Sequence, residues 1–307
     1  MFRVFIDGSA GTTGLRIRER LAGRKDLELI LLPEEARKDE NARKDAMSRS
    51  DVTFFCLPDD AAREAAGWAG PEGPVIIDTS TAHRVAPGWV YGLPELKGQR
   101  EKIAGAKRIA NPGCHATGFL ALAAPLVAEG VLSPESRLSC FSLTGYSGGG
   151  KKMIADYEAD GRDPLLDAPR QYGLTQAHKH LPEMAAYAGL THPPVFSPVV
   201  APYLAGMEVT IPLTDADTPL SPEELTEIYR AYYSSGLIRL AAESAEGGFL
   251  SAGALAGRDS LEITVQGNRE RKVLISRFDN LGKGASGAAI QNMNLALGLP
   301  EDLGLVV

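Results

Sequence analysis

The sequence predicts an α/β protein in which a Rossmann-type doubly wound domain is followed by an α+β domain with a mixed sheet. Three observations support this fold class. Apolar runs alternate with helical patterns in the first third of the chain, a glycine-rich turn follows the first run, and alternating strands dominate after Cys114. With 307 residues, the chain is long enough for about two domains.

The first third contains four apolar runs that we expect to form strands. They cover residues 2–6, 27–32, 52–57 and 75–78. The run 52–57 (VTFFCL) is nearly continuous, which is typical of a strand buried on both faces. Helical patterns at 15–21 and 59–68 separate these runs, and the charged stretch 34–49 is interpreted as a solvated helix or loop. Strands that alternate with helices in this order indicate a parallel sheet.

After Cys114 the strands become longer and alternate between apolar and polar residues, as in a sheet with one buried face. We expect strands at 137–143, 207–212, 261–265 and 273–278, and helices at 119–127, 221–235 and 286–297. Ser221 and Glu224 form an S-x-x-E capping box, and that helix should end near Ser235. We therefore place a dinucleotide-binding domain at 1–113, completed by the C-terminal helical segment 285–307, and a second domain at 114–284.

Composition argues against several classes of protein. Acidic residues outnumber basic ones by 39 to 32, and the net charge of −7 is unlike the basic face of a nucleic-acid-binding protein. No apolar stretch approaches the roughly 20 residues of a membrane span, and the N-terminal run is too short for a secretory signal. Three scattered cysteines form no disulfide framework and no metal-ligand spacing. We expect a cytoplasmic protein with no metal, nucleic-acid or membrane partner.

The turn 8–14 (GSAGTTG) follows the first expected strand and opens the first helix. Small residues there let the backbone approach a pyrophosphate, and the helix N-terminus supplies free N–H groups. The alternative is a tight turn without a ligand. After the second strand, Glu34 and Glu35 can hold a ribose 2′-hydroxyl, whereas Arg37 and Lys38 can hold a 2′-phosphate. The residues leave this choice open.

Cys114 lies in the segment NPGCHATG, directly before an apolar helix, where the helix dipole stabilises a thiolate. Cys56 and Cys140 lie in expected strands and are interpreted as core thiols. A nucleophilic thiol needs a base, and His178 and His180 are candidates because residues i and i+2 of an extended segment face the same side.

Glu183 follows His180 at the start of a short helix and can orient its imidazole. A metal site lacks further ligands at a recognisable spacing. A pair of surface histidines is the simpler alternative.

Three further segments carry polar groups at positions where α/β proteins bind ligands. The segment DTSTAHR, with Ser80 and Arg84, follows the expected strand at 75–78. The segment YSGGGK, with Ser147, Gly148 and Lys151, can form an oxyanion or phosphate cradle, or a flexible loop. The segment NLGKGASG, which starts at Asn280, precedes the last helix and can close over a cofactor.

Together these segments resemble the N-acetyl-γ-glutamyl-phosphate reductase family of arginine biosynthesis, in particular its shorter subfamily. GSAGTTG, NPGCHATG, HKHLPE and DNLGKGASGAAIQ occur in the family's order, and the resemblance covers essentially the whole chain. The specific part is NPGC followed by H-x-H-x-P-E. The family belongs with the semialdehyde dehydrogenases, so the resemblance implies an NADP-binding domain and a catalytic domain that also forms the oligomer interface.

The resemblance also implies roles for individual residues. Cys114 attacks the acyl phosphate and expels phosphate, a hydride from NADPH reduces the thioester, and His180 acts as acid and base, oriented by Glu183. The implied NADP-binding residues are Gly8, Ser9, Ala10, Gly11, Thr12, Thr13, Gly14, Ser80, Asn280, Gly282, Lys283 and Gly284. The implied substrate-binding residues are Arg84, Asn111, Ser147, Gly148, Lys151 and His178. A homo-oligomer, either a dimer or a tetramer, is implied as well.

Other functions remain open at this stage. The substrate can be a related acyl phosphate, aspartyl or N-acetyl-aminoadipyl, because one methylene in a pocket changes binding by only about 1–3 kcal/mol. A non-catalytic NADP-binding regulator would keep the fold without needing a reactive thiol. A cofactor-free Cys-His hydrolase would use the same nucleophile and base without a dinucleotide.

Overall fold

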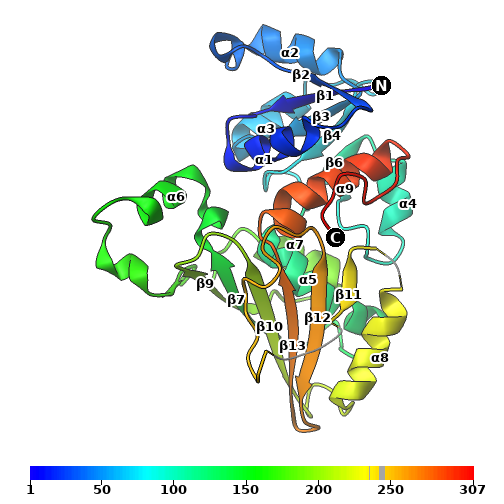
Figure 1. Cartoon of the computed structure of the whole chain (residues 1–307). Helices are drawn as coiled ribbons and strands as arrows, with labels where there is room; N and C mark the ends of the chain where they lie inside the picture. Colours follow the sequence, from blue (N-terminus) through cyan, green and yellow to red (C-terminus); the bar gives the residue numbers. More distant parts are fainter. Residues whose placement is uncertain (235, 242–245) are drawn as a thin grey trace. The chain divides into compact units, whose positions relative to one another are not determined.

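The computed structural model describes residues 1–234, 236–241 and 246–307. It divides into two compact units (Figure 1). The first comprises Met1–Pro112 and Ala285–Leu305, and the second comprises Gly113–Gly284 with Val306–Val307. Gly113 and the last two residues therefore belong to the second unit, which differs from the expected segments 1–113 and 285–307. Val306 joins this unit because its N–H donates to Asp259 Oδ2 at 2.9 Å.

The first unit is built on a six-stranded parallel sheet in the order β2-β1-β3-β4-β6-β5. Its strands are β1 (Phe2–Asp7), β2 (Leu27–Ile30), β3 (Val52–Phe55), β4 (Val75–Asp78), β5 (Val90–Tyr91) and β6 (Arg108–Ala110). All four residues of β3 and of β4 are buried, as their apolar runs predict. The prediction of a doubly wound parallel sheet is confirmed.

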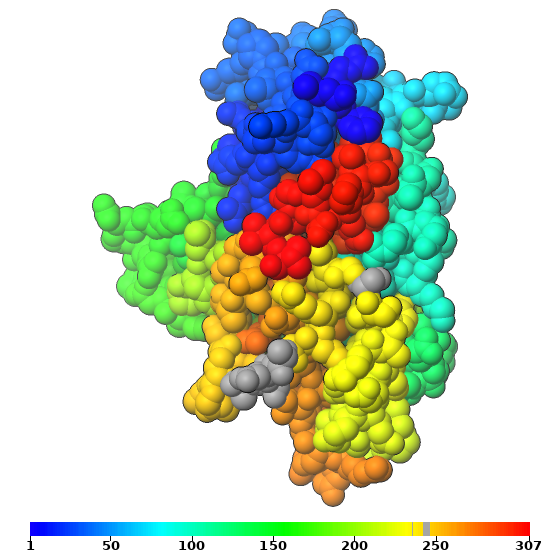
Figure 2. Space-filling view, turned by 45° about the vertical axis from the view of Figure 1, so that its right-hand side comes forward, coloured from blue at the N-terminus to red at the C-terminus, as the bar shows by residue number. Residues whose placement is uncertain are grey.

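Helices cover both faces of this sheet. They are α1 (Thr12–Leu21), η1 (Glu34–Ala36), α2 (Glu40–Ser48), α3 (Asp59–Ala66), α4 (Gln99–Ala104) and α9 (Gly287–Ala296). Side chains of α1 and α9, including Ile17 and Ile290, pack with Val4 and Phe54 on one face. Residues of α2 and α3 pack with Phe5 on the other. Figure 2 shows the C-terminal segment against the N-terminal residues of this unit.

The second unit is built on a seven-stranded sheet in the order β11-β12-β13-β10-β7-β9-β8. The prediction that this sheet is mixed is confirmed. Its strands are β7 (Ser139–Gly145), β8 (Arg170–Gln171), β9 (Val195–Ala201), β10 (Met207–Thr214), β11 (Ile238–Leu240), β12 (Leu261–Gly267) and β13 (Arg271–Phe278). The pairs β7–β9 and β11–β12 are parallel, and the other pairs are antiparallel. Burial alternates along β10, as expected for a sheet with one packed face.

Helices α5 (Cys114–Ala128), α7 (Leu181–Ala188) and α8 (Pro222–Tyr232) belong to this unit, together with α6 (Gly150–Glu158), η2 (Tyr146–Gly149) and η3 (Pro164–Asp167). Helix α5 packs closely on the sheet at Gly118, where a Cβ would lie 2.5 Å from Val209 Cγ2. The capping box of Ser221 and Glu224 is present at the start of α8. The predicted end of this helix at Ser235 lies outside the described residues.

Several boundaries and elements differ from the prediction. Helix α5 begins at Cys114 rather than near residue 119, because its first turn carries few large apolar side chains for a pattern to detect. The segment 146–151, interpreted as a cradle or loop, folds as η2 followed by α6. The strands β5, β6, β8, β9 and β11 were not predicted. In the described part of the chain, no helix is long and apolar enough to span a membrane.

Candidate active site

Cys114 is the first residue of α5, and Gly113 precedes it as the N-cap in an extended conformation. The side chain of Cys114 is partly exposed. A residue of helix α7 binds the backbone at this position. The Gly113 N–H donates to Glu183 Oε2 at 3.1 Å, and Glu183 is 1% exposed. A thiol at this position lies where the partial positive charge of the helix N-terminus favours the thiolate.

The other two cysteines have environments that oppose ionisation. Burial raises the pKa of Cys56, which follows β3, to about 12. Burial also raises the pKa of Cys140, on β7, well above the usual range of a thiol. Cys114 is therefore the cysteine whose surroundings suit a nucleophile.

His178 and His180 lie together, with ring centroids 4.7 Å apart and ring planes nearly perpendicular. The prediction of an extended segment is wrong: His180 has helical dihedral angles as the N-cap of α7, and its N–H donates to His178 Nδ1 at 3.2 Å. The turn, rather than the i, i+2 geometry of a strand, brings the rings to one side. Within the described residues, no group of three or more His, Cys, Asp or Glu side chains is arranged to hold a metal ion.

Two side chains outside the predicted site, those of His115 and Tyr172, complete this cluster. His115, next to Cys114, bonds to Ser142 Oγ through Nδ1 at 2.7 Å and to Tyr172 Oη through Nε2 at 2.6 Å. Its ring centroid lies 5.5 Å from that of His180 and 5.6 Å from that of His178. Only the adjacency of His115 to Cys114 could have indicated its importance, and nothing local to Tyr172 could.

The pKa values of these two residues are strongly perturbed. Burial, together with the nearby His178, lowers the pKa of His115 to about 3, so its imidazole is neutral at physiological pH. Burial also raises the pKa of Tyr172 well above its usual range, and the negative charge of Cys114 adds to this effect. Tyr172 therefore stays protonated at physiological pH.

The segment 279–284 of the second unit lies against Cys114 at Gly284. A Cβ on Gly284 would lie 2.9 Å from Cys114 Cβ, and a Cβ on Gly282 would lie 2.1 Å from Arg258 O. Asp279 fixes the loop, because its Oδ1 accepts from the N–H groups of Leu281 and Gly282. Lys283 is fully buried. The loop can hold this shape beside the cysteine only with glycine at 284.

The side chains of Asn280 and Ser147 form a hydrogen bond with each other. Asn280 Nδ2 donates to Ser147 Oγ at 2.9 Å, and Asn280 Oδ1 accepts from the Gly206 N–H at 2.9 Å. Both residues are 1% exposed. These contacts give the two predicted binding residues a structural role, because they connect η2 to the segments at Gly206 and Asn280. Gly148 and Lys151, by contrast, are exposed.

In the first unit, the turn 8–14 packs against the end of β3. Gly8 has a φ of +87°, and a Cβ there would lie 2.2 Å from Cys56 O, whereas a Cβ on Gly14 would lie 2.5 Å from Gly8 O. A Cβ on Gly11 would meet nothing closer than 3.5 Å. The chain's own packing therefore explains the first and third glycines but not the second. A ligand that approaches the backbone at Gly11 would explain it.

A cavity of about 790 Å³ begins at this turn and ends at η1. Gly8, Ser9 and Ala10 line one end, and the residues at the other end are Glu34, Glu35, Arg37 and Lys38. Two buried polar atoms of the described residues in this region, Thr12 Oγ1 and Arg37 Nε, have no hydrogen-bond partner. Buried donors are rarely left unpaired, so they fit a phosphate-bearing ligand.

Asp7 and Arg43 also line this cavity and pair with each other, with 2.9 Å between Asp7 Oδ2 and Arg43 Nη2. Burial raises the pKa of Asp7, and the contact with Arg43 opposes that rise. Asp7 directly precedes the glycine turn, but no sequence motif marks its pairing with Arg43, which lies 36 residues away.

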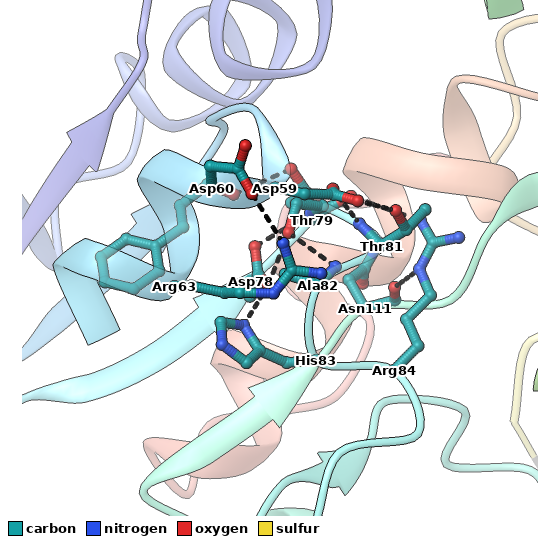
Figure 3. A network of polar contacts seen from close by, with 12 residues as sticks. Asp59, Asp60, Arg63, Asp78, Thr79, Thr81, Ala82, His83, Arg84 and Asn111 are labelled. Atoms are coloured by element: carbon teal, nitrogen blue, oxygen red, sulfur yellow. Dashed lines mark hydrogen bonds and ion pairs between the residues drawn. The ribbon is translucent and has the colours of Figure 1, made fainter. Parts of the chain in front are cut away.

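The segment after β4 forms a polar network within the first unit (Figure 3). Asp78, fully buried, accepts from the N–H and Oγ of Ser80 and contacts His83 Nδ1 at 2.6 Å. Arg84 Nε donates to Asn111 O at 3.0 Å, and the Asn111 amide donates to Ala285 O at 3.1 Å. The predicted ligand-binding side chains Ser80, Arg84 and Asn111 thus shape this loop through their own hydrogen bonds.

Comparison with known proteins defines the class. Residues 34–106 match the family model described as the NAD binding domain of semialdehyde dehydrogenases, and residues 114–280 match the one described as their dimerisation domain. The chain is similar in fold to aspartate semialdehyde dehydrogenase II of Vibrio cholerae, with a TM-score of 0.73 and 17% identity over 97% of this chain and 99% of that chain. The first unit is thus an NAD(P)-binding domain of the semialdehyde dehydrogenase class.

The curated relatives are more specific. The N-acetyl-gamma-glutamyl-phosphate reductase 2 of Nostoc sp. is 44% identical over 99% of both chains. The N-acetyl-gamma-glutamyl-phosphate reductase of Rhizobium meliloti is 45% identical over 96% of this chain and 98% of its own. The chain belongs to the N-acetyl-gamma-glutamyl-phosphate reductase family.

Proposed function

We propose that this protein is an NADPH-dependent reductase of N-acetyl-glutamyl 5-phosphate that forms N-acetyl-glutamate 5-semialdehyde and phosphate through a thioester on Cys114. The observation that carries the proposal is identity of 44–45% over nearly the full length of curated reductases with this name. The position of Cys114 at the start of α5 supports the same chemistry, because the ring centroid of the next residue, His115, lies 5.6 Å from that of His178 and 5.5 Å from that of His180. The reduced thiol suits a cytoplasmic protein.

The first unit fits a dinucleotide. The open space at Gly11, the unpaired Thr12 Oγ1 and the cavity that ends at Arg37 are features that a bound pyrophosphate and adenosine would use. The residues that would hold the cofactor are those of the turn 8–14, with Ser80 and the loop from Asn280 to Gly284 as further candidates. When bound, the nicotinamide supplies the hydride that reduces the acyl group on Cys114.

The chain's own residues account for the other steps. The Cys114 thiolate attacks the acyl carbon, and the C–O bond to phosphate breaks, which leaves a thioester. His180 exchanges protons at the active site as acid and base. Glu183 holds the Gly113 N–H and so fixes the start of α5, in addition to its proposed orientation of His180. Arg84, Asn111, Ser147, Gly148, Lys151 and His178 stay candidates for substrate binding.

The basic residues at the end of the cavity support NADPH rather than NADH as the cofactor. Arg37 lines the cavity with a buried, unpaired Nε, and Lys38 lines it beside Arg37. Arg37→Ala should weaken NADPH binding about 10–100-fold, the worth of a charge-assisted hydrogen bond, and leave NADH binding unchanged. Glu35→Ala serves as the control, and weaker NADH binding in that variant would favour a ribose 2′-hydroxyl instead. Fluorescence titration measures both.

A homo-oligomer follows from the open face of the second sheet. Val209 of β10 faces α5 at Gly118, so its neighbour Thr210 faces the other side, in register with Phe141 and Ile275. Phe141 and Val195 are 42% and 62% exposed. A second copy of the chain would cover these apolar side chains, in a dimer or a tetramer. Light scattering should give a multiple of the chain mass, and Phe141→Glu should reduce it to the monomer.

The function itself is tested in the reverse direction, with NADP, phosphate and a panel of semialdehydes. We expect the highest kcat/KM with N-acetyl-glutamate 5-semialdehyde. A higher value with aspartate semialdehyde or N-acetyl-aminoadipate semialdehyde would reassign the substrate. Dinucleotide binding without turnover of any of them would indicate a regulator, and the absence of dinucleotide binding would favour a cofactor-free hydrolase.

A further inference from the structure

Three side chains of the second unit form a hydrogen-bonded chain centred on His115, the residue that follows Cys114. Ser142 lies on β7, His115 is the second residue of α5, and Tyr172 follows β8. The two links are 2.7 Å from Ser142 Oγ to His115 Nδ1 and 2.6 Å from His115 Nε2 to Tyr172 Oη. Ser142 is fully buried and His115 is 2% exposed, so water does not compete for the hydrogen bond between them.

Because His115 is neutral, the two hydrogen bonds of this chain can run in only two directions. A neutral imidazole carries one N–H and one bare nitrogen, so one ring nitrogen donates and the other accepts. In the first arrangement His115 Nδ1 donates to Ser142, and the Tyr172 hydroxyl donates to His115 Nε2. In the second, Ser142 donates to Nδ1, His115 Nε2 donates to Tyr172 Oη, and the hydroxyl hydrogen of Tyr172 is left to bond another acceptor.

The charge near Cys114 selects between them. Tyr172 stays protonated, and it lies among the active-site histidines, with its ring centroid 5.8 Å from that of His178. A phenol whose oxygen accepts from His115 directs its hydrogen toward an anion, and a hydrogen bond to a charged acceptor is stronger than one between neutral groups. In the second arrangement the Tyr172 hydroxyl can donate to an anion. Before the reaction this anion is the Cys114 thiolate, and after Cys114 attacks a carbonyl it is the carbonyl oxygen, which then carries the negative charge.

We propose that His115, held by Ser142, is a positioning residue that turns the Tyr172 hydroxyl toward Cys114, so that Tyr172 donates a hydrogen bond to the oxyanion formed there. This inference rests on the proposed function, because it assigns a donor to the intermediate of that reaction. No proton leaves Tyr172. His115 acts only through the tyrosine and never touches the substrate, whereas Tyr172 is the catalytic residue of the pair.

The test is a double-mutant cycle on the full-length protein, assayed with NADP, phosphate and N-acetyl-glutamate 5-semialdehyde. Tyr172→Phe should lower kcat about 10²-fold, the worth of one oxyanion donor, with little change in KM. His115→Leu should cause the same loss, and His115→Gln, whose amide can donate to Tyr172, should recover most of it. The double variant Tyr172→Phe with His115→Leu should be no slower than Tyr172→Phe alone.

A matched control separates catalysis from stability. Tyr229 is a buried tyrosine of α8 whose hydroxyl donates to Leu122 O at 2.6 Å. Tyr229→Phe should lower thermal stability and leave kcat unchanged. A double variant about tenfold slower than Tyr172→Phe, or a His115→Leu variant with the kcat of the wild type, would overturn the inference.

A second readout does not need the substrate. The rate of Cys114 alkylation by iodoacetamide as a function of pH reports the ionisation of its thiol. Tyr172→Phe and His115→Leu should shift this profile to higher pH by equal amounts, because both remove the same hydrogen bond to the thiolate. If the wild type turns over no semialdehyde, the proposed function fails, and this profile still decides the inference: unequal shifts, or none, would contradict it.

Discussion

The two glycine-rich segments of the molecule require glycine for different reasons. In the turn 8–14, Gly8 and Gly14 let the backbone fold on itself, and Gly11 leaves space that nothing in the chain fills. In the loop after β13, Gly282 lets the backbone pass Arg258, and Gly284 leaves room for Cys114, a residue about half the chain away. The first site is thus made by one local segment, whereas the second needs distant segments to meet.

The largest effect should come from filling the space beside Cys114. In Gly284→Ala the new methyl would lie 2.9 Å from Cys114 Cβ, so the thiol must move. Because a displacement of about 1 Å can cost about 10²-fold in rate, kcat should fall by that factor. The alkylation rate of Cys114 should change with it. Gly253→Ala is the control, since a Cβ there meets nothing closer than 3.7 Å, and an equal loss in that variant would refute the explanation.

The next effect distinguishes the glycines of the turn 8–14. Gly11→Ala should leave the melting temperature near that of the wild type and weaken dinucleotide binding about tenfold or more, because the methyl occupies the open space. Gly14→Ala should instead lower the free energy of unfolding by about 1–3 kcal/mol, since its methyl meets Gly8 O at 2.5 Å. Calorimetry and fluorescence titration measure the two quantities. If Gly11→Ala binds the dinucleotide normally, no ligand approaches there.

The smallest effect concerns the buried polar side chains of the second site. The pKa of His115 is lowered to about 3 in the folded protein from an ordinary value of 6.5. The unfolded chain therefore takes up a proton below about pH 6.5 that the folded protein does not, and stability falls as the pH drops toward 3. Between pH 7 and pH 5 this amounts to about 2 kcal/mol at most.

His115→Gln removes this titrating group, so its free energy of unfolding should fall less over that interval than that of the wild type. Urea unfolding at the two pH values measures the difference. If the free energy of unfolding falls equally in the two proteins between pH 7 and pH 5, His115 takes up a proton in the folded state as it does in the unfolded chain.

The fold could be predicted wherever the signal is local. The runs at β1, β3 and β4, the capping box at Ser221 and the glycine turn each depend on residues within about ten positions. The strand β9 and helix α6 were missed because their stability comes from partners elsewhere: β9 pairs with β7, and Tyr157 of α6 packs with Leu166 and Val200. Propensity alone says little about such elements.

The candidate site shows the same limit. Cys114 and the His178–His180 pair could be found because each lies in a short, unusual motif. Tyr172 and Ser142 could not, because the sheet brings them to His115 from positions 57 and 27 residues away. The sequence also suggested ligand-binding roles for Ser147 and Asn280 whose side chains bond each other. A polar residue in a promising loop does not reveal whether its partner is a ligand or the protein itself.

The central claim is that Cys114 carries the acyl group, and one measurement tests it directly. The protein is mixed with NADP and N-acetyl-glutamate 5-semialdehyde without phosphate, and NADPH formation and the intact mass of the protein are followed. Thioester formation should stop after one NADPH per active site, with the acyl group on Cys114, and phosphate should then restore turnover. Cys114→Ala should give no burst, whereas Cys140→Ala should give the full one. A burst in Cys114→Ala, or an acyl group on another residue, would contradict the account.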